Sequence, residues 1–100
     1  MNVRVFKLIN GEVVIGEVKE ENDGFMVLKG AANIILQQND SGVGVGIADY
    51  MPYSSGPVTL RVSAIASEAS PDSKLENEYN RIYGSGLIMA SAADLKGLQK

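Results

Sequence analysis

The first two-thirds of the chain alternates apolar runs with polar turns, a pattern that predicts β-strands. Val3–Ile9 and Glu12–Val18 are rich in β-branched residues, and Asn10-Gly11 separates them. Because Asn and Gly both tolerate positive φ, this dipeptide predicts a two-residue hairpin turn. The cross-strand pairs that this turn predicts are Leu8–Val13, Phe6–Ile15 and Arg4–Glu17.

Both faces of this predicted hairpin carry apolar residues. A small open sheet would expose one of them to water, so we expect a closed barrel or a partner that covers it. Gly16 interrupts the second strand, and glycine inside a strand permits the sharp bend with which small barrels turn corners. A third strand begins at Phe25 and continues to Leu36 through a kink at Lys29-Gly30.

Glycine occupies every second position from Gly42 to Gly46, and two interpretations are open. A glycine-rich loop can cradle phosphate, but this spacing matches neither nucleotide-binding pattern, and no Lys-Ser/Thr follows. A fourth strand with one glycine face, which another backbone can approach closely, fits the alternation better. Val58–Val62 predicts a fifth strand that extends to Ile65 or Ser67.

The pattern changes at Ser70, where strand-like alternation gives way to a helical period. Ser70-Pro71-Asp72 is typical of an N-cap, a first helical position and an acidic first turn. Gly84 is placed to end the helix. The apolar stripe that predicts this helix comprises Leu75, Tyr79, Ile82 and Tyr83.

These patterns divide the chain into three segments. We expect a β-rich domain over residues 1–68, a helix over residues 70–84 and a flexible Gly/Ser/Ala-rich tail over residues 85–100. An apolar island in the tail, Leu87–Met89, is a candidate for docking on a neighbouring subunit. No run approaches about 18 apolar residues, and the start resembles a strand more than a signal peptide, so we expect a cytoplasmic protein with no membrane partner.

Composition excludes several kinds of chemistry. The 100 residues include no Cys, His or Trp, which removes disulfides, thiolate ligands and histidine acid–base catalysis. Twelve acidic and nine basic residues give a net charge of −3, so bulk charge does not attract a phosphate backbone. Because no paired carboxylates, metal-ligand spacing or nucleophile motif is present, we expect neither an enzyme nor a cofactor or metal site.

Three stretches of the β-rich segment resemble signatures of the Sm-like (LSm/Hfq-type) family. In the first signature, a glycine in the first turn is followed five residues later by another glycine and then by an apolar residue, as in Gly11, Gly16 and Val18. Asp23–Val27 resembles the pattern D-x-aromatic-M-N but lacks its asparagine. Leu60–Ile65 resembles hydrophobic-Arg-Gly-x-x-Ile, with valine in place of the glycine.

The resemblance implies a mainly β fold, a small five-stranded, strongly bent Sm-like (SH3-like) barrel, here with a C-terminal α-helix. Family members usually carry their helix before the first strand, and the chain resembles the short Sm-like proteins of tailed phages. The family also implies a homo-oligomeric ring of about five to seven subunits, in which the fourth strand of one subunit pairs with the fifth of the next. A phage-encoded member would act in the host cytoplasm.

The same resemblance implies single-stranded RNA as a partner, bound at the pore by Asp23, Phe25 and Arg61. Phe25 would stack on a base, and Arg61 would contact phosphate or a base edge. Each residue also has a purely structural interpretation: Phe25 as core, Asp23-Gly24 as a turn, and Arg61 as the partner of an acid. The alternative function is a non-catalytic assembly or protein-interaction module that does not bind nucleic acid.

Overall fold

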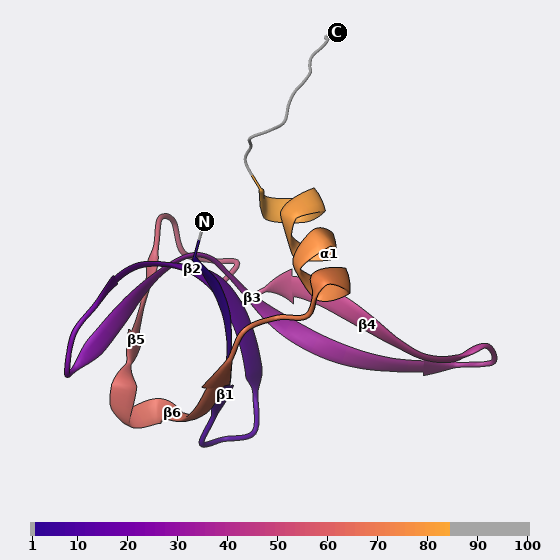
Figure 1. Ribbon diagram of the computed structural model, residues 1–100, viewed down its shortest axis with the longest axis horizontal. Coiled ribbons are helices and arrows are strands. Elements are labelled where there is room, and N and C mark those ends of the chain that lie inside the picture. The colour runs from indigo at the N-terminus through magenta and orange to yellow at the C-terminus, as the bar shows by residue number, and fades with distance from the viewer. Residues whose placement is uncertain (1, 85–100) are drawn as a thin grey trace, which may run out of the picture. The chain divides into compact units, whose positions relative to one another are not determined.

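A computed structural model describes residues 2–84, apart from the side chain of Asn39, and is mainly β with one α-helix in that range (Figure 1). The predicted tail and its apolar island lie outside the described residues. A 3₁₀ turn (Val62–Ala64) precedes the last strand, and helix α1 spans Ser73–Tyr83. The strands are β1 (Val3–Leu8), β2 (Val13–Glu21), β3 (Phe25–Asn39), β4 (Gly42–Asp49), β5 (Val58–Arg61) and β6 (Ile65–Ala69).

The strands form one antiparallel sheet that folds back on itself. β1 pairs with β2 and β6, and β3 pairs with β2, β4 and β5. Because only the 3₁₀ turn separates β5 from β6, the circuit β1–β2–β3–β5–β6 returns to β1, as in a small barrel. The sequence predicts five strands, whereas the structure has six, since the predicted fifth strand is divided at Val62–Ala64 between two partners.

β3 leaves the barrel part-way along its length. Its first residues, Phe25–Leu28, pair with β5, whereas residues 32–39 pair with β4. Gly30 has a φ of +64°, so the predicted kink is confirmed, at a position where glycine avoids a steric penalty. Beyond Asn33, the last partner of β2, only β4 flanks β3 among residues 2–84. We call this two-stranded hairpin, residues 34–47, the arm; in Figure 1 it runs away from the curved sheet.

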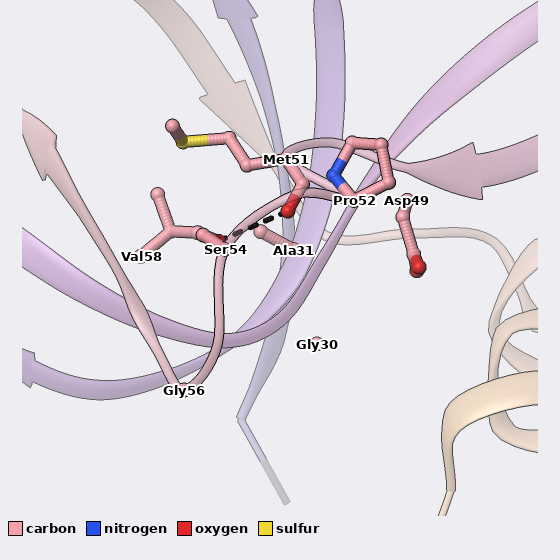
Figure 2. A pocket seen from close by; sticks show the side chains of 8 residues that line it. All are labelled: Gly30, Ala31, Asp49, Met51, Pro52, Ser54, Gly56 and Val58. Atoms are coloured by element: carbon pink, nitrogen blue, oxygen red, sulfur yellow. Dashed lines mark hydrogen bonds between the residues drawn. The ribbon is translucent and has the colours of Figure 1, made fainter.

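The run of alternating glycines in the arm forms strand β4, as the strand interpretation predicts. A loop over residues 50–57 then joins β4 to β5. At the base of the arm this loop borders a hollow of about 140 Å³ (Figure 2), and the Ser54 hydroxyl donates to the Met51 carbonyl across 2.9 Å. The hollow is lined by Gly30, Ala31, Asp49, Met51, Pro52, Ser54, Gly56 and Val58.

The predicted register of the first hairpin is wrong by one residue. Phe6 pairs with Val14, and Lys7 pairs with Val13. The Gly11 N–H donates to the Leu8 carbonyl across 2.9 Å, and Gly11 has a φ of +93°. These features describe a three-residue loop that ends on a left-handed glycine, the other hairpin that an Asn-Gly sequence supports. The predicted pairs Leu8–Val13, Phe6–Ile15 and Arg4–Glu17 therefore do not form.

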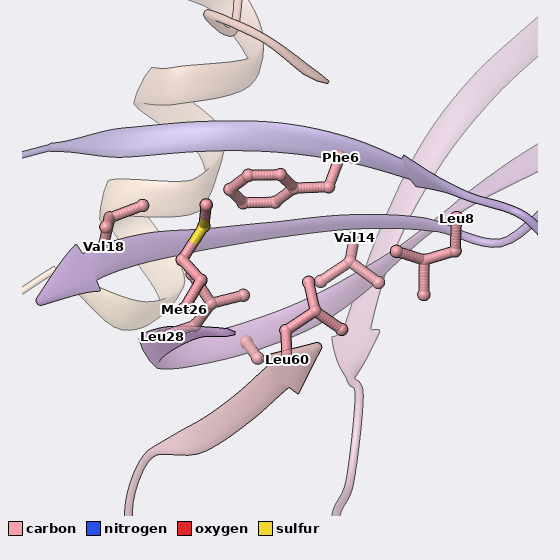
Figure 3. Close-up of a cluster of buried hydrophobic side chains, with 8 residues drawn as sticks. Phe6, Leu8, Val14, Val18, Met26, Leu28 and Leu60 are labelled. Carbon is pink, nitrogen blue, oxygen red and sulfur yellow. The ribbon is translucent and has the colours of Figure 1, made fainter. Parts of the chain in front are cut away.

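The core lies inside the barrel (Figure 3) and draws on β1, β2, β3 and β5. Each fully buried aliphatic or aromatic side chain contributes roughly 1.5–3 kcal/mol. Val14 and Ile15 are adjacent on β2 and point to opposite faces, yet both are fully buried, so both faces of β2 are covered at this position. The core cluster consists of Phe6, Leu8, Val14, Val18, Met26, Leu28, Ala31 and Leu60.

Helix α1 begins two residues later than the sequence predicts. The N-cap is Asp72, not Ser70, because the Asp72 carboxylate accepts the Leu75 N–H across 2.8 Å. Of the predicted stripe, Tyr79 is buried and stacks on Tyr83 with ring centroids 5.1 Å apart, whereas Ile82 is exposed. The helix ends at Gly84, whose φ of −67° is ordinary; a Cβ there would clash with the Asn80 carbonyl oxygen.

Candidate nucleic-acid interface

The turn between β2 and β3 is held by Asn22. Its side-chain oxygen accepts the backbone N–H groups of Gly24 and Phe25 across 2.8 and 3.0 Å. The backbone N–H of Asn22 donates to the Phe25 carbonyl across 3.0 Å. An Asn side chain that bonds the backbone two residues ahead is a standard way to close a tight turn. The turn therefore holds Asp23 exposed between the two strands.

The structure brings Asp23, Phe25 and Arg61 into one place. Phe25 is the first residue of β3 and lies directly opposite Arg61, the last residue of β5. The Val62 N–H also donates to the Gly24 carbonyl across 3.0 Å, which ties the 3₁₀ turn to the Asn22 turn. Side chains at directly opposed positions share a face with Cβ atoms about 4.5–5.5 Å apart.

Two of the three structural interpretations of these residues find no support within residues 2–84. Phe25 is half-buried and lies outside the core cluster, so it is not a core residue. Arg61 is exposed and forms no ion pair with any residue between 2 and 84. Asp23-Gly24 does form a turn, which leaves Asp23 exposed two residues before Phe25.

The charges around this cluster are mainly acidic. Glu20 and Glu21, at the end of β2, pair with the next residues of β3 after Phe25. Glu21 shares Arg4 with Glu68, and the Arg4–Glu21 distance is 3.4 Å, so the Arg4 charge is already compensated. The cluster thus presents one aromatic face, one uncompensated guanidinium and one carboxylate. These groups suit stacking and base-edge hydrogen bonds better than they suit a run of phosphates.

Sequence reasoning assigned no role to Asn22. The signal was present, because Asn followed two residues later by Gly is typical of a turn closed by the Asn side chain. The two departures from the Sm-like signatures also have visible consequences. Val27 stands where the signature has asparagine and pairs with Thr59, and Val62 stands where it has glycine and begins the 3₁₀ turn.

The hollow at the base of the arm is a weaker candidate for a binding site. Asp49 is its one charged lining residue, and most of the rest are small or apolar. Across residues 2–84, no three His, Cys, Asp or Glu side chains are grouped so that they would hold a metal ion. In the same range, no helix has the length and apolar character that a bilayer crossing requires.

Comparison with known proteins does not assign this chain to a family. No model of a known protein family matches the sequence, and no curated protein sequence matches it either.

Proposed function

We propose that this protein is an Sm-like subunit that assembles into a ring and binds single-stranded RNA through Asp23, Phe25 and Arg61. One observation carries the proposal: Phe25 and Arg61, quoted from two separate signatures, are directly opposed cross-strand partners. Residues that are about 36 positions apart in the chain are thereby placed on one face, beside the Asn22 turn.

Each side chain of the cluster has a distinct part in this proposal. The half-buried Phe25 ring offers a platform on which a base stacks, a contact worth about 1–3 kcal/mol per base. The Arg61 guanidinium donates to a base edge or a phosphate, and the Asp23 carboxylate accepts from a base amino group or a ribose hydroxyl. Because Glu20 and Glu21 lie close by, stacking supplies most of the affinity.

Strand edges support the ring. Within the described residues β5 pairs only with β3, and β6 only with β1, so each has a free outer edge. The fourth and fifth strands expected from the sequence, Val43–Ile47 and Val58–Val62, correspond to β4 and β5. Because β4 belongs to the arm, we instead assign the contact between subunits to β5 and β6. Pairing β5 of one subunit with β6 of the next satisfies both edges, and repetition of this head-to-tail contact closes a ring of about five to seven subunits. In this proposal the protein acts in the cytoplasm, that of the host for a phage-encoded chain.

Fluorescence anisotropy with oligo-U, oligo-A and mixed RNA at low salt tests RNA binding. We expect Phe25→Leu and Arg61→Gln each to weaken binding by about tenfold, since about 1.4 kcal/mol corresponds to tenfold. Tyr53→Leu and Arg81→Gln are the matched controls, because both residues are exposed and lie outside the cluster. Absence of binding at tens of micromolar protein, or equal losses in the controls, would refute the proposal.

Salt dependence separates stacking from phosphate contact. Each phosphate contact to single-stranded nucleic acid contributes a slope of about −0.7 to the logarithm of affinity against the logarithm of salt. We expect a shallow slope that Phe25→Leu leaves unchanged. A steep slope, equivalent to several phosphate contacts, would contradict a site with a single uncompensated guanidinium.

The second candidate function is a non-catalytic assembly module that does not bind RNA. The acidic surroundings of the cluster and the valine at position 27 favour it. Light scattering combined with the RNA titration distinguishes the two functions. A discrete oligomer with no affinity for RNA supports the assembly module, whereas a monomer contradicts both proposals.

A further inference from the structure

The two faces of the arm differ sharply in composition. Opposed pairs on one face are Ile34–Ile47, Leu36–Val45 and Gln38–Val43. The opposite face carries glycine at all three of its β4 positions, Gly42, Gly44 and Gly46. A Cβ at Gly46 would lie 2.9 Å from the Gln37 side-chain nitrogen, so the Gln37 amide lies over this strand and adds a polar group to this face, which also carries the exposed Ile35. We call the face that holds Ile34, Leu36, Val43, Val45 and Ile47 the apolar face of the arm.

Much of this apolar face is exposed. Leu36 keeps 73%, Val43 68% and Val45 51% of their full accessibility. Isolated two-stranded hairpins are marginally stable in water, and independent stability requires a third strand or a packed face. Exposed β-branched residues on a flat ribbon are also prone to association. The arm therefore needs a cover, and within the described residues neither a third strand nor a packed layer is built from its own sheet.

The charge distribution indicates what the cover is. Between Lys29 and Asp49 the sequence contains a single charged residue, Asp40, which lies in the turn at the tip of the arm. Two identical apolar faces can therefore meet without bringing like charges together. A dimer related by a two-fold axis requires a surface that is complementary to itself, and an uncharged ribbon of alternating side chains meets that requirement.

We propose that the apolar face of the arm packs against the same face of the arm from a second copy of this chain. The two-fold axis passes near the Leu36–Val45 pair, which lies at the middle of the three pairs on this face. Six paired positions at about 3.4 Å each give an arm about 20 Å long and only two strands wide. That footprint is well below the roughly 800 Å² per partner of a standard interface, so one arm pair associates weakly and depends on concentration.

This contact is separate from the proposed ring. The ring uses the free edges of β5 and β6, whereas the arm contact uses side chains on a face of β3 and β4. The two contacts can therefore fail independently, and an arm contact between subunits of different rings would join rings through several weak links at once.

The absence of cysteine from the sequence allows a direct test. Leu36→Cys and Val45→Cys place a single thiol near the proposed axis, and Gln37→Cys and Ile35→Cys place one on the opposite face as matched controls. Under mild oxidation of the full chain at about 50 μM, we expect the first two variants to form disulfide-linked dimers at least tenfold faster than the controls. Equal rates on the two faces, or no dimer from any variant, would overturn the proposal.

A second measurement tests the arm contact as a reversible association, without a covalent link. The double variant Leu36→Gln/Val45→Thr keeps strand-compatible residues and removes the apolar pair. In sedimentation velocity over a hundredfold range of protein concentration, we expect it to lose the concentration-dependent species of the native chain and to keep any discrete ring. RNA affinity should not change. A double variant that associates as the native chain does would refute the arm contact and leave the ring and RNA proposals untouched.

Discussion

The two halves of β3 place the same residue type in opposite environments. Leu28, at the barrel end, is fully buried, whereas Leu36, at the arm end, keeps 73% of its accessibility. Within the part of the chain that the structure describes, the barrel end is flanked by β2 and β5, and the arm end by β4 alone. The difference shows that apolar alternation indicates an extended strand, while the number of neighbouring strands decides whether the strand is covered.

The largest effect is expected when each of the two leucines is truncated in turn. We expect Leu28→Ala to lower the free energy of unfolding by about 2–5 kcal/mol, because it removes buried contacts and leaves a cavity. Leu36→Ala should change it by less than about 0.5 kcal/mol, as exposed substitutions do. Urea titration followed by circular dichroism measures both at a protein concentration low enough to dissociate arm contacts. Losses of similar size would show that the arm is packed within a single chain.

The glycines give the second test. A Cβ at Gly16 would lie 3.2 Å from the Leu28 Cβ, closer than a well-packed core accommodates without movement. We expect Gly16→Ala to destabilise the protein by about 1–3 kcal/mol through overpacking. Gly44→Ala is the arm counterpart, since its nearest neighbour would be the Gln37 carbonyl oxygen at 3.9 Å. It should be neutral in the same urea titration, and a loss as large as that at Gly16 would contradict the comparison.

Gly30 lies where the barrel and the arm divide, and its φ is +64°. An alanine in this left-handed conformation costs about 1–2 kcal/mol. We therefore expect Gly30→Ala to be destabilising and Gly30→Asn to recover part of the loss, because Asn tolerates this conformation better. Thermal unfolding measures the order native, Asn, Ala; an alanine variant as stable as the native chain would show that the kink relaxes.

The smallest expected effect is at Tyr50, whose N–H donates to the Ala31 carbonyl across 3.0 Å at the base of the arm. Burial, followed by the nearby Glu12 carboxylate, raises the pKa of Tyr50 above its ordinary 10.0. The fold thus favours the neutral phenol, and this contribution to stability is full below pH 10 and is lost as pH rises through the raised pKa. Tyr50→Phe should remove this alkaline loss in unfolding measured from pH 8 to 11, whereas Tyr53→Phe should retain it.

The sequence predicts the strand-rich segment and the helix because alternation and capping are local properties. It misplaces the first hairpin by one residue because Asn10-Gly11 is compatible with both a two-residue and a three-residue loop. The helix begins at the wrong residue for a similar reason, since Ser70 and Asp72 are both good N-caps. In each case two local solutions have similar cost, so the local sequence alone does not select between them.

The sequence also does not predict that the fifth strand is divided. The residues of Val58–Ser67 are all common in strands, so the sequence contains no signal for the 3₁₀ turn at Val62–Ala64. The turn forms because the chain must pass from a strand paired with β3 to a strand paired with β1. For the candidate site, the three residues follow from the signatures, whereas their juxtaposition depends on the β3–β5 register. Asn22 was recognisable only as a turn former.

The continuous course of β3 from barrel to arm constrains how the length of the arm can change. Side chains of a strand alternate between faces, so one residue inserted between Gly30 and Asn39 would turn over every arm residue beyond it while the barrel register stays fixed. Two residues added to each strand of the arm would only lengthen it. Homologous chains should therefore differ in this hairpin by even numbers of residues per strand, a parity rule that sequence alignment can check.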